Sequence, residues 1–114
     1  MRSKLVVYVD VDDTLVQWAG SKAIPRTMVI EHVRALHAAG ATLYCWSTGG
    51  GEYSREVARD LEIEGLFEAF LPKPEVMLDD QPPTDWRALR VVYPMNVRVT
   101  EDPVSEYRAE LDGS

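Results

Sequence analysis

The sequence predicts an α/β fold: a single Rossmann-like, three-layer domain with a parallel sheet of about five strands. Two observations carry this prediction. Short runs of β-forming apolar residues alternate with segments of helical periodicity. Polar residues follow the ends of several of these runs, as at the carboxyl ends of parallel strands. The length of 114 residues suits one domain, residues 1–114, with one core.

The first strand is predicted from five consecutive apolar residues, 5–9, and is expected to be buried on both faces. Asp10 and Asp12 lie at its carboxyl end. Residues 16–24 have no sustained periodicity, which indicates a loop or short hairpin above the two carboxylates.

Periodicity and breaker residues predict the remaining elements in order. Helices are expected at 25–40, where Pro25 suits the first turn and Gly40 the end, at 53–61, at 84–90, and in a helical or frayed tail from residue 101. Further strands are expected at 41–46, 68–71, 75–78 and 96–100.

Composition restricts the partners and the location of the protein. The net charge is −7, with 19 acidic and 12 basic residues, which disfavours binding to nucleic acids and to anionic membranes. No apolar run has membrane-spanning length, and no signal-peptide pattern is present, so a cytoplasmic location is expected.

Three residues with reactive side chains have structural interpretations. The single Cys45 falls in a predicted strand and is expected to be a small buried core residue. His32 and His37 are five residues apart on a predicted helix, on different faces and without metal-site spacing. Both are predicted to lie at the surface or at its boundary with the core.

The segment Asp10-x-Asp12-x-Thr14-Leu15 is the most specific motif of the chain. Two carboxylates this close repel each other unless a cation or a shared proton relieves them, so the motif predicts a metal site. The alternative is that these residues only cap a turn.

Three later motifs could complete a site. Ser47 follows the second strand, Lys73 lies between two prolines, and Asp79-Asp80 follows residues 76–78. The glycine-rich turn after Ser47, residues 49–51, either offers backbone N–H groups to a phosphate or simply makes the turn.

In this order, these motifs resemble those of the haloacid dehalogenase (HAD) superfamily of phosphohydrolases, and the resemblance covers residues 5–80. It implies a phosphatase in which Asp10 is the nucleophile, forming an aspartyl phosphate, and Asp12 is the general acid and base. Ser47 would donate its hydroxyl to a phosphoryl oxygen, with Thr48 as a rival, and Lys73 would offset negative charge.

The resemblance also implies a Mg²⁺ ion held by Asp10, by the backbone carbonyl of Asp12, and by Asp79 and Asp80, in an order within the pair that stays open. Mg²⁺ prefers oxygen ligands, which suits this set.

The short spacing between motifs leaves no room for a cap domain, so something else must cover the site. The substrate is a phosphorylated molecule, with an extended or macromolecular phosphoester favoured unless the chain forms a homo-oligomer. Trp18, Thr48 and Gly49 are the expected substrate-binding residues, with Trp18 presenting an aromatic face.

Two other functions stay open. A phosphoacceptor signalling module similar to a receiver domain has comparable residues, but there the phosphoacceptor aspartate precedes the lysine, whereas Asp79 follows Lys73 here. The second is a catalytically silent binding module of HAD-like fold.

Overall fold

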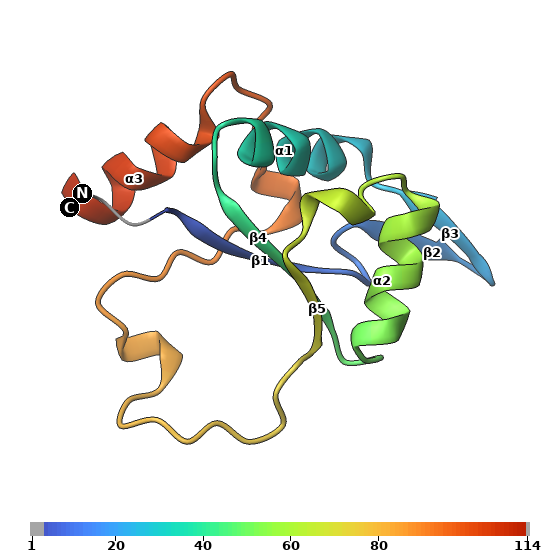
Figure 1. Cartoon of the computed structure of the whole chain (residues 1–114), viewed down its shortest axis with the longest axis horizontal. Coiled ribbons are helices and arrows are strands. Elements are labelled where there is room, and N and C mark those ends of the chain that lie inside the picture. Colours follow the sequence, from blue (N-terminus) through green and yellow to red (C-terminus); the bar gives the residue numbers. More distant parts are fainter. Residues whose placement is uncertain (1–3, 114) are drawn as a thin grey trace.

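The computed structural model describes residues 4–113 and is built on a three-stranded parallel sheet (Figure 1). The strands β1 (Val6–Asp10), β4 (Thr42–Ser47) and β5 (Ala69–Pro72) lie in the order β1-β4-β5. Asp10 pairs with Trp46, and Ser47 pairs with Pro72. The carboxyl ends of the three strands therefore meet at one edge of the sheet, as predicted for an α/β chain.

Helices α1 (Thr27–Ala38) and α2 (Gly51–Asp60) connect these strands, and α3 (Pro103–Gly113) ends the described chain. Both crossovers run in the same direction along the sheet, and right-handed crossovers then place both helices on one face. The sheet contributes Val9, Leu43 and Cys45 to the core from this face, and the helices contribute Val33 and Ala58.

The opposite face of the sheet is open, which corrects the prediction of a three-layer domain. Tyr8 is 47% exposed and Val6 is 58% exposed, although their strand was expected to be buried on both faces. The ring of Tyr8 packs against two neighbouring rings. Its centroid lies 5.1 Å from that of Tyr44 and 4.8 Å from that of Trp46. The described residues thus form two layers, because no crossover returns along the sheet to place a helix on the second face.

The expected fourth strand, residues 75–78, is absent from the sheet. Val76 and Leu78 are 80% and 96% exposed. Only Lys73 and Pro74 separate this segment from β5, whereas a parallel neighbour needs a crossover of about a dozen residues. The apolar run is therefore not paired with any strand of the sheet.

The expected fifth strand, residues 96–100, is also absent. A single 3₁₀ turn, Pro94–Asn96, takes up the first residue of this segment. The Arg98 carbonyl in the segment accepts a hydrogen bond from a side chain instead of joining a ladder. The helix expected at 84–90 is replaced by one 3₁₀ turn, Pro83–Asp85. The helical conformation ends there because the backbone of Trp86 is extended. Residues 73–102 make a long excursion between β5 and α3 (Figure 1).

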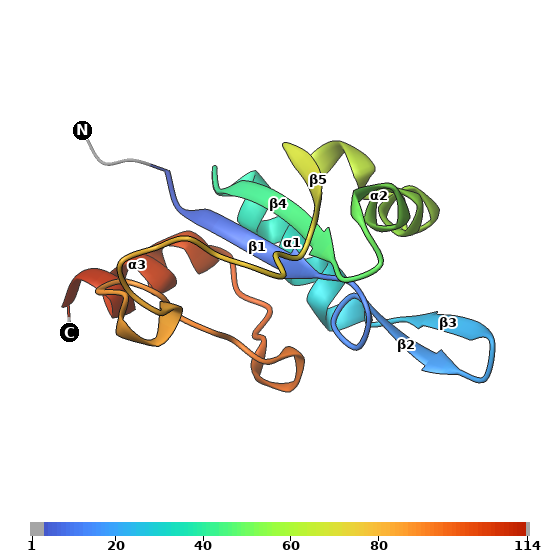
Figure 2. The same cartoon turned by 90° about the horizontal axis from the view of Figure 1, so that it is seen from below.

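The loop or hairpin expected at 16–24 is a hairpin. Its strands β2 (Val16–Ala19) and β3 (Lys22–Pro25) pair antiparallel and turn at Gly20, whose φ of +62° favours glycine. Figure 2 shows the hairpin projecting from the carboxyl end of β1. Pro25 ends this hairpin rather than opening the helix, which begins at Thr27.

His32 is buried, contrary to the prediction, whereas His37 is exposed as expected. The Nδ1 atom of His32 lies 2.9 Å from the Arg98 carbonyl oxygen, and Nε2 lies 2.8 Å from the Tyr107 hydroxyl. A neutral ring that donates from Nδ1 and accepts at Nε2 satisfies both contacts. The imidazole thus links α1 to α3 and to the segment before it.

Burial lowers the pKa of His32, against smaller raising effects from the Arg98 hydrogen bond and from Glu106. Below the ordinary histidine pKa, His32 takes up a proton more readily in the unfolded chain than in the native one. The free energy of unfolding therefore falls as the pH falls. We expect the urea midpoint of the wild type to drop between about pH 8 and about pH 5.5, and the drop to be smaller in His32→Gln. His37→Gln is the matched control and should retain the wild-type pH dependence. An equal drop in His32→Gln and in the wild type would contradict this role.

Candidate active site

Asp10 ends β1 at the carboxyl edge of the sheet, and both of its carboxylate oxygens have partners. Lys73 Nζ lies 3.1 Å from Oδ1, and the Thr14 hydroxyl donates to Oδ2 at 3.1 Å. The side chains of Asp10 and Lys73 are each about one-third exposed, so the pair is accessible to a ligand. Lys73 Nζ also lies 5.8 Å from the centroid of the Trp46 ring.

Lys73 reaches Asp10 from β5, the strand at the opposite edge of the sheet from β1. It directly follows β5, and its backbone N–H donates to the Ser47 carbonyl at 2.9 Å. This bond continues the β4–β5 pairing by one residue. Lys73 therefore lies beside Asp10, where its charge can offset negative charge as the resemblance implies.

Asp12 lies in the turn between β1 and the hairpin. The Val11 carbonyl accepts the N–H groups of Thr14 and Leu15, and Asp13 adopts a φ of +63°, so the chain bends sharply around Asp12. The Trp18 indole N–H donates to Asp12 Oδ1 at 2.8 Å, and the Tyr53 hydroxyl donates to the same oxygen at 2.7 Å.

Tyr53 is the site residue that sequence reasoning missed, because its helical spacing with Val57 and Leu61 reads as part of an apolar face. Its place in the first turn of α2, just after the glycine-rich turn, is the signal that could have revealed it. Burial, followed by the hydrogen bond to Asp12 and the charge of Asp12, raises the pKa of Tyr53 to about 12. The hydroxyl therefore stays protonated and remains a donor near neutral pH.

The glycine-rich turn shapes the space beside these carboxylates. Gly50 has a φ of +102° and occupies the N-cap position of α2, which has no side-chain cap. The N–H groups of the first helical turn are thus free of a capping side chain, a feature that favours an anion. A Cβ on Gly49 would lie 2.8 Å from the Tyr53 ring, so glycine here makes room for that ring.

Ser47 and Thr48 differ in accessibility. Ser47 is 1% exposed, and its Oγ accepts the Gly49 N–H at 3.0 Å, so it orders the turn from inside. Thr48 is exposed. Of the two residues only Thr48 is exposed, whereas the resemblance favours Ser47 as the donor to a phosphoryl oxygen and keeps Thr48 as its rival.

Asp79 and Asp80 are not brought to Asp10 and Asp12. Both are exposed in the 73–102 excursion, and Asp79 Oδ1 accepts the Gln81 N–H. Within residues 4–113 no group of three or more His, Cys, Asp or Glu side chains could hold a metal ion. The arrangement described here does not fit a four-carboxylate magnesium site, and both Asp10 oxygens already have partners.

Cys45 lies behind the site in the core, as predicted. Burial, and to a lesser extent the charge of Asp10, raises the pKa of its thiol to about 12, although a hydrogen bond with Ser54 opposes this. The thiol is therefore protonated at neutral pH and is a poor nucleophile.

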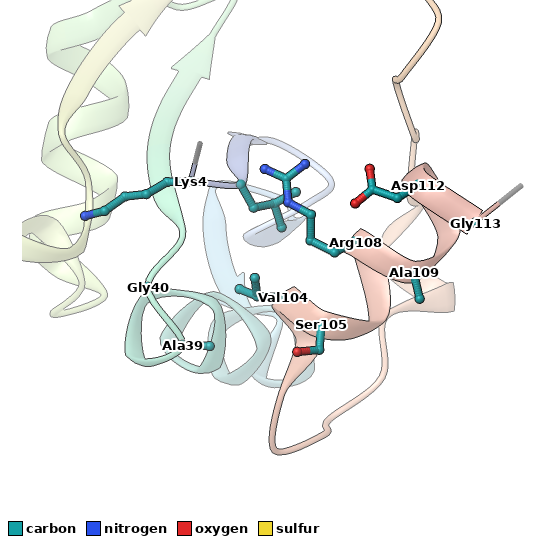
Figure 3. A pocket seen from close by; sticks show the side chains of 10 residues that line it. Lys4, Ala39, Gly40, Val104, Ser105, Arg108, Ala109, Asp112 and Gly113 are labelled. Carbon is teal, nitrogen blue, oxygen red and sulfur yellow. The ribbon is translucent and has the colours of Figure 1, made fainter. Parts of the chain in front are cut away.

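A cavity of about 650 Å³ lies at the opposite end of the sheet from Asp10. Leu5, Gly40, Val104 and Arg108 are among its lining residues, from the start of β1, the end of α1 and helix α3 (Figure 3). Neither Asp10 nor Asp12 lines it. The chemistry expected from the sequence thus belongs to the carboxyl edge of the sheet and not to this cavity.

Close packing of α2 on β5 fixes the site, and a glycine substitution tests it. A Cβ on Gly51 would lie 2.5 Å from the Phe70 carbonyl oxygen, whereas a Cβ on Gly65 would meet nothing within 4 Å. We expect Gly51→Ala to lower the free energy of unfolding by about 1–3 kcal/mol in urea denaturation. Gly65→Ala is the control and should change it by about 0.5 kcal/mol or less. Equal effects would show that α2 does not pack this closely on β5.

Two further findings bear on identity. Among residues 4–113 no helix is both long enough and apolar enough to cross a membrane. Comparison with protein-family models, with curated proteins and with solved structures found no match to this chain.

Proposed function

We propose that this protein is a phosphomonoester hydrolase, a HAD-like phosphatase that forms an aspartyl phosphate on Asp10. The observation that carries the proposal is the 3.1 Å ion pair between Asp10 and Lys73 at the carboxyl edge of a parallel sheet. In open α/β sheets this edge is where ligands bind. A carboxylate nucleophile beside a fixed cation suits attack on a phosphate, which is itself negatively charged.

The reaction has two displacements. First, an oxygen of Asp10 attacks phosphorus, the bond from phosphorus to the leaving-group oxygen breaks, and Asp12 gives that oxygen a proton. Then Asp12 takes a proton from a water molecule whose oxygen attacks phosphorus, and the bond between phosphorus and Asp10 breaks. Phosphate leaves, Asp10 is again a carboxylate, and Asp12 again carries the proton that it gave up in the first displacement.

Charge compensation is the main task of the surrounding residues. The Lys73 ammonium group, which is paired with Asp10 before the reaction, offsets negative charge on the phosphoryl oxygens as they approach. The uncapped amino end of α2 adds the partial positive charge of its N–H groups. Thr48 and Gly49, which precede this end in the chain, are proposed phosphate contacts, and the Gly49 N–H would have to leave Ser47 Oγ to make one. Ser47 acts indirectly, by ordering the turn.

A magnesium requirement is proposed from the sequence resemblance alone, with Asp10 and the backbone carbonyl of Asp12 as ligands. Mg²⁺ often takes only one or two protein carboxylates and completes its shell with water and phosphate oxygens. Asp79 and Asp80 would join it only if the 73–102 excursion took another position. Bound there, the ion would add charge compensation at the phosphate, while the attack on phosphorus and the proton transfers would remain with Asp10 and Asp12.

The substrate proposed here is an extended or macromolecular phosphoester. The site lies at an exposed edge, and Trp18, which is 44% exposed, is the aromatic residue of the hairpin beside it. A large substrate, or a second copy of the chain, would exclude water from the carboxylates. A cytoplasmic location is part of this proposal, and nucleic acid is disfavoured as a substrate by the charge of −7.

Replacing the nucleophile tests the covalent step. Asp10→Asn should lower release of phosphate from an aryl phosphate by roughly 10³-fold or more and should abolish the phosphoenzyme trapped by acid quench. Asp13→Asn is the matched control, because Asp13 is exposed and asparagine tolerates its φ of +63°. A hydroxylamine-labile phosphoenzyme in Asp10→Asn would overturn the assignment. Long-lived phosphorylation of the wild type without turnover would favour a phosphoacceptor module instead.

Chelation tests the magnesium requirement separately. We expect EDTA to reduce phosphate release to background and added Mg²⁺ to restore it, because the phosphate and carboxylate charges at the site need compensation beyond Lys73. The measurement is phosphate release by the wild type before chelation, after chelation and after readdition of the metal. Equal turnover with and without EDTA would remove magnesium from the proposal and leave the Asp10 step intact.

A further inference from the structure

We propose that Tyr53 is a positioning residue for Asp12: its hydroxyl holds Oδ1 of that carboxylate and leaves Oδ2 as the oxygen that exchanges a proton with the substrate. This inference rests on the proposed function, in which Asp12 is the general acid and base. Tyr53 itself does not touch the reacting atoms, since it acts through Asp12.

The geometry at Asp12 Oδ1 is the first argument. The Tyr53 hydroxyl and the Trp18 indole N–H converge on this one oxygen at 2.7 and 2.8 Å. Hydrogen bonds to a carboxylate are among the stronger ones in proteins, so two of them restrict rotation of the group. No hydrogen bond to Oδ2 is among those found in the described part of the chain.

The two donors differ in how firmly they are held, which is the second argument. Trp18 belongs to the projecting hairpin and is 44% exposed. Tyr53 belongs to α2, which packs on the sheet through buried Ser54 and Ala58 and through the close approach of Gly51 to Phe70. Tyr53 thus keeps Asp12 oriented when a substrate displaces the hairpin.

The glycine-rich turn supports this role independently. The Tyr53 ring fills the space that a side chain at position 49 would need, because a Cβ there would lie 2.8 Å from ring atom Cδ2. The turn that leads into the uncapped amino end of α2 therefore also sets the position of the ring. Phosphate contact and orientation of the acid are built from one segment, residues 49–53.

The leaving group provides the test. An alkyl phosphate needs its leaving oxygen protonated, whereas a nitrophenyl phosphate does not, so a misplaced acid slows the first more than the second. In Tyr53→Phe we expect the rate of phosphoenzyme formation to fall about 10-fold or more with the alkyl ester and about twofold or less with the nitrophenyl ester. Tyr93→Phe removes an exposed hydroxyl elsewhere and should change neither rate. Equal slowing with both esters would mean that Tyr53 has only a structural role.

A spectroscopic measurement makes this result independent of the proposed function. In a ¹H–¹⁵N spectrum, the Trp18 indole resonance is assigned by its loss in Trp18→Phe. Its chemical shift should change in Asp12→Asn and in Tyr53→Phe. It should stay unchanged in the control, Tyr93→Phe. If that resonance moves while the wild type forms no phosphoenzyme, the hydrogen-bonded arrangement stands and the phosphatase proposal falls. If it stays in place in Tyr53→Phe while phosphoenzyme forms normally, the positioning role falls and the phosphatase proposal stands.

Discussion

The ion pair between Lys73 and Asp10 is the interaction on which the site depends, because it joins the two outer strands of the sheet across the central one. Asp10 ends β1 and Lys73 follows β5, so the pair forms only if both strands keep their register with β4. With both side chains one-third exposed, the pair adds little to stability. Its effect is on orientation, since it places a cation beside the proposed nucleophile.

Asp12 connects parts of the chain that are distant in sequence. Trp18 reaches it from the hairpin and Tyr53 reaches it from α2. The hairpin and the helix are otherwise held separately, the one by its own pairing and the other by the sheet. Trp18 therefore links Asp12 to the hairpin, whereas Tyr53 links the same carboxylate to α2 and, through that helix, to the sheet.

The direction of the crossovers decides what surrounds the site. Because α1 and α2 lie on one face, the other face exposes an aromatic row in which Tyr8 contacts Tyr44 and Trp46. Asp10 pairs with Trp46 in the β1–β4 register, so the candidate nucleophile stands at the rim of this open face. The proposed preference for a large substrate agrees with an edge site beside a face that no helix layer covers in the part of the chain that the structure describes.

Local signals in the sequence determined the α/β class, the three paired strands, the first two helices and the strand-end position of Asp10 and Asp12. These depend on periodicity, turn residues and strand ends, which neighbours in sequence set. The same signals left residues 16–24 open between a loop and a hairpin, and the tail open between helical and frayed. The structure alone decided which apolar runs find a partner: residues 75–78 follow β5 too closely to cross over, and the segment at 96–100 uses the Arg98 carbonyl to bind His32. It also brought Tyr53 to Asp12, because a contact between residues 41 positions apart arises from the packing of α2 and has no local signal.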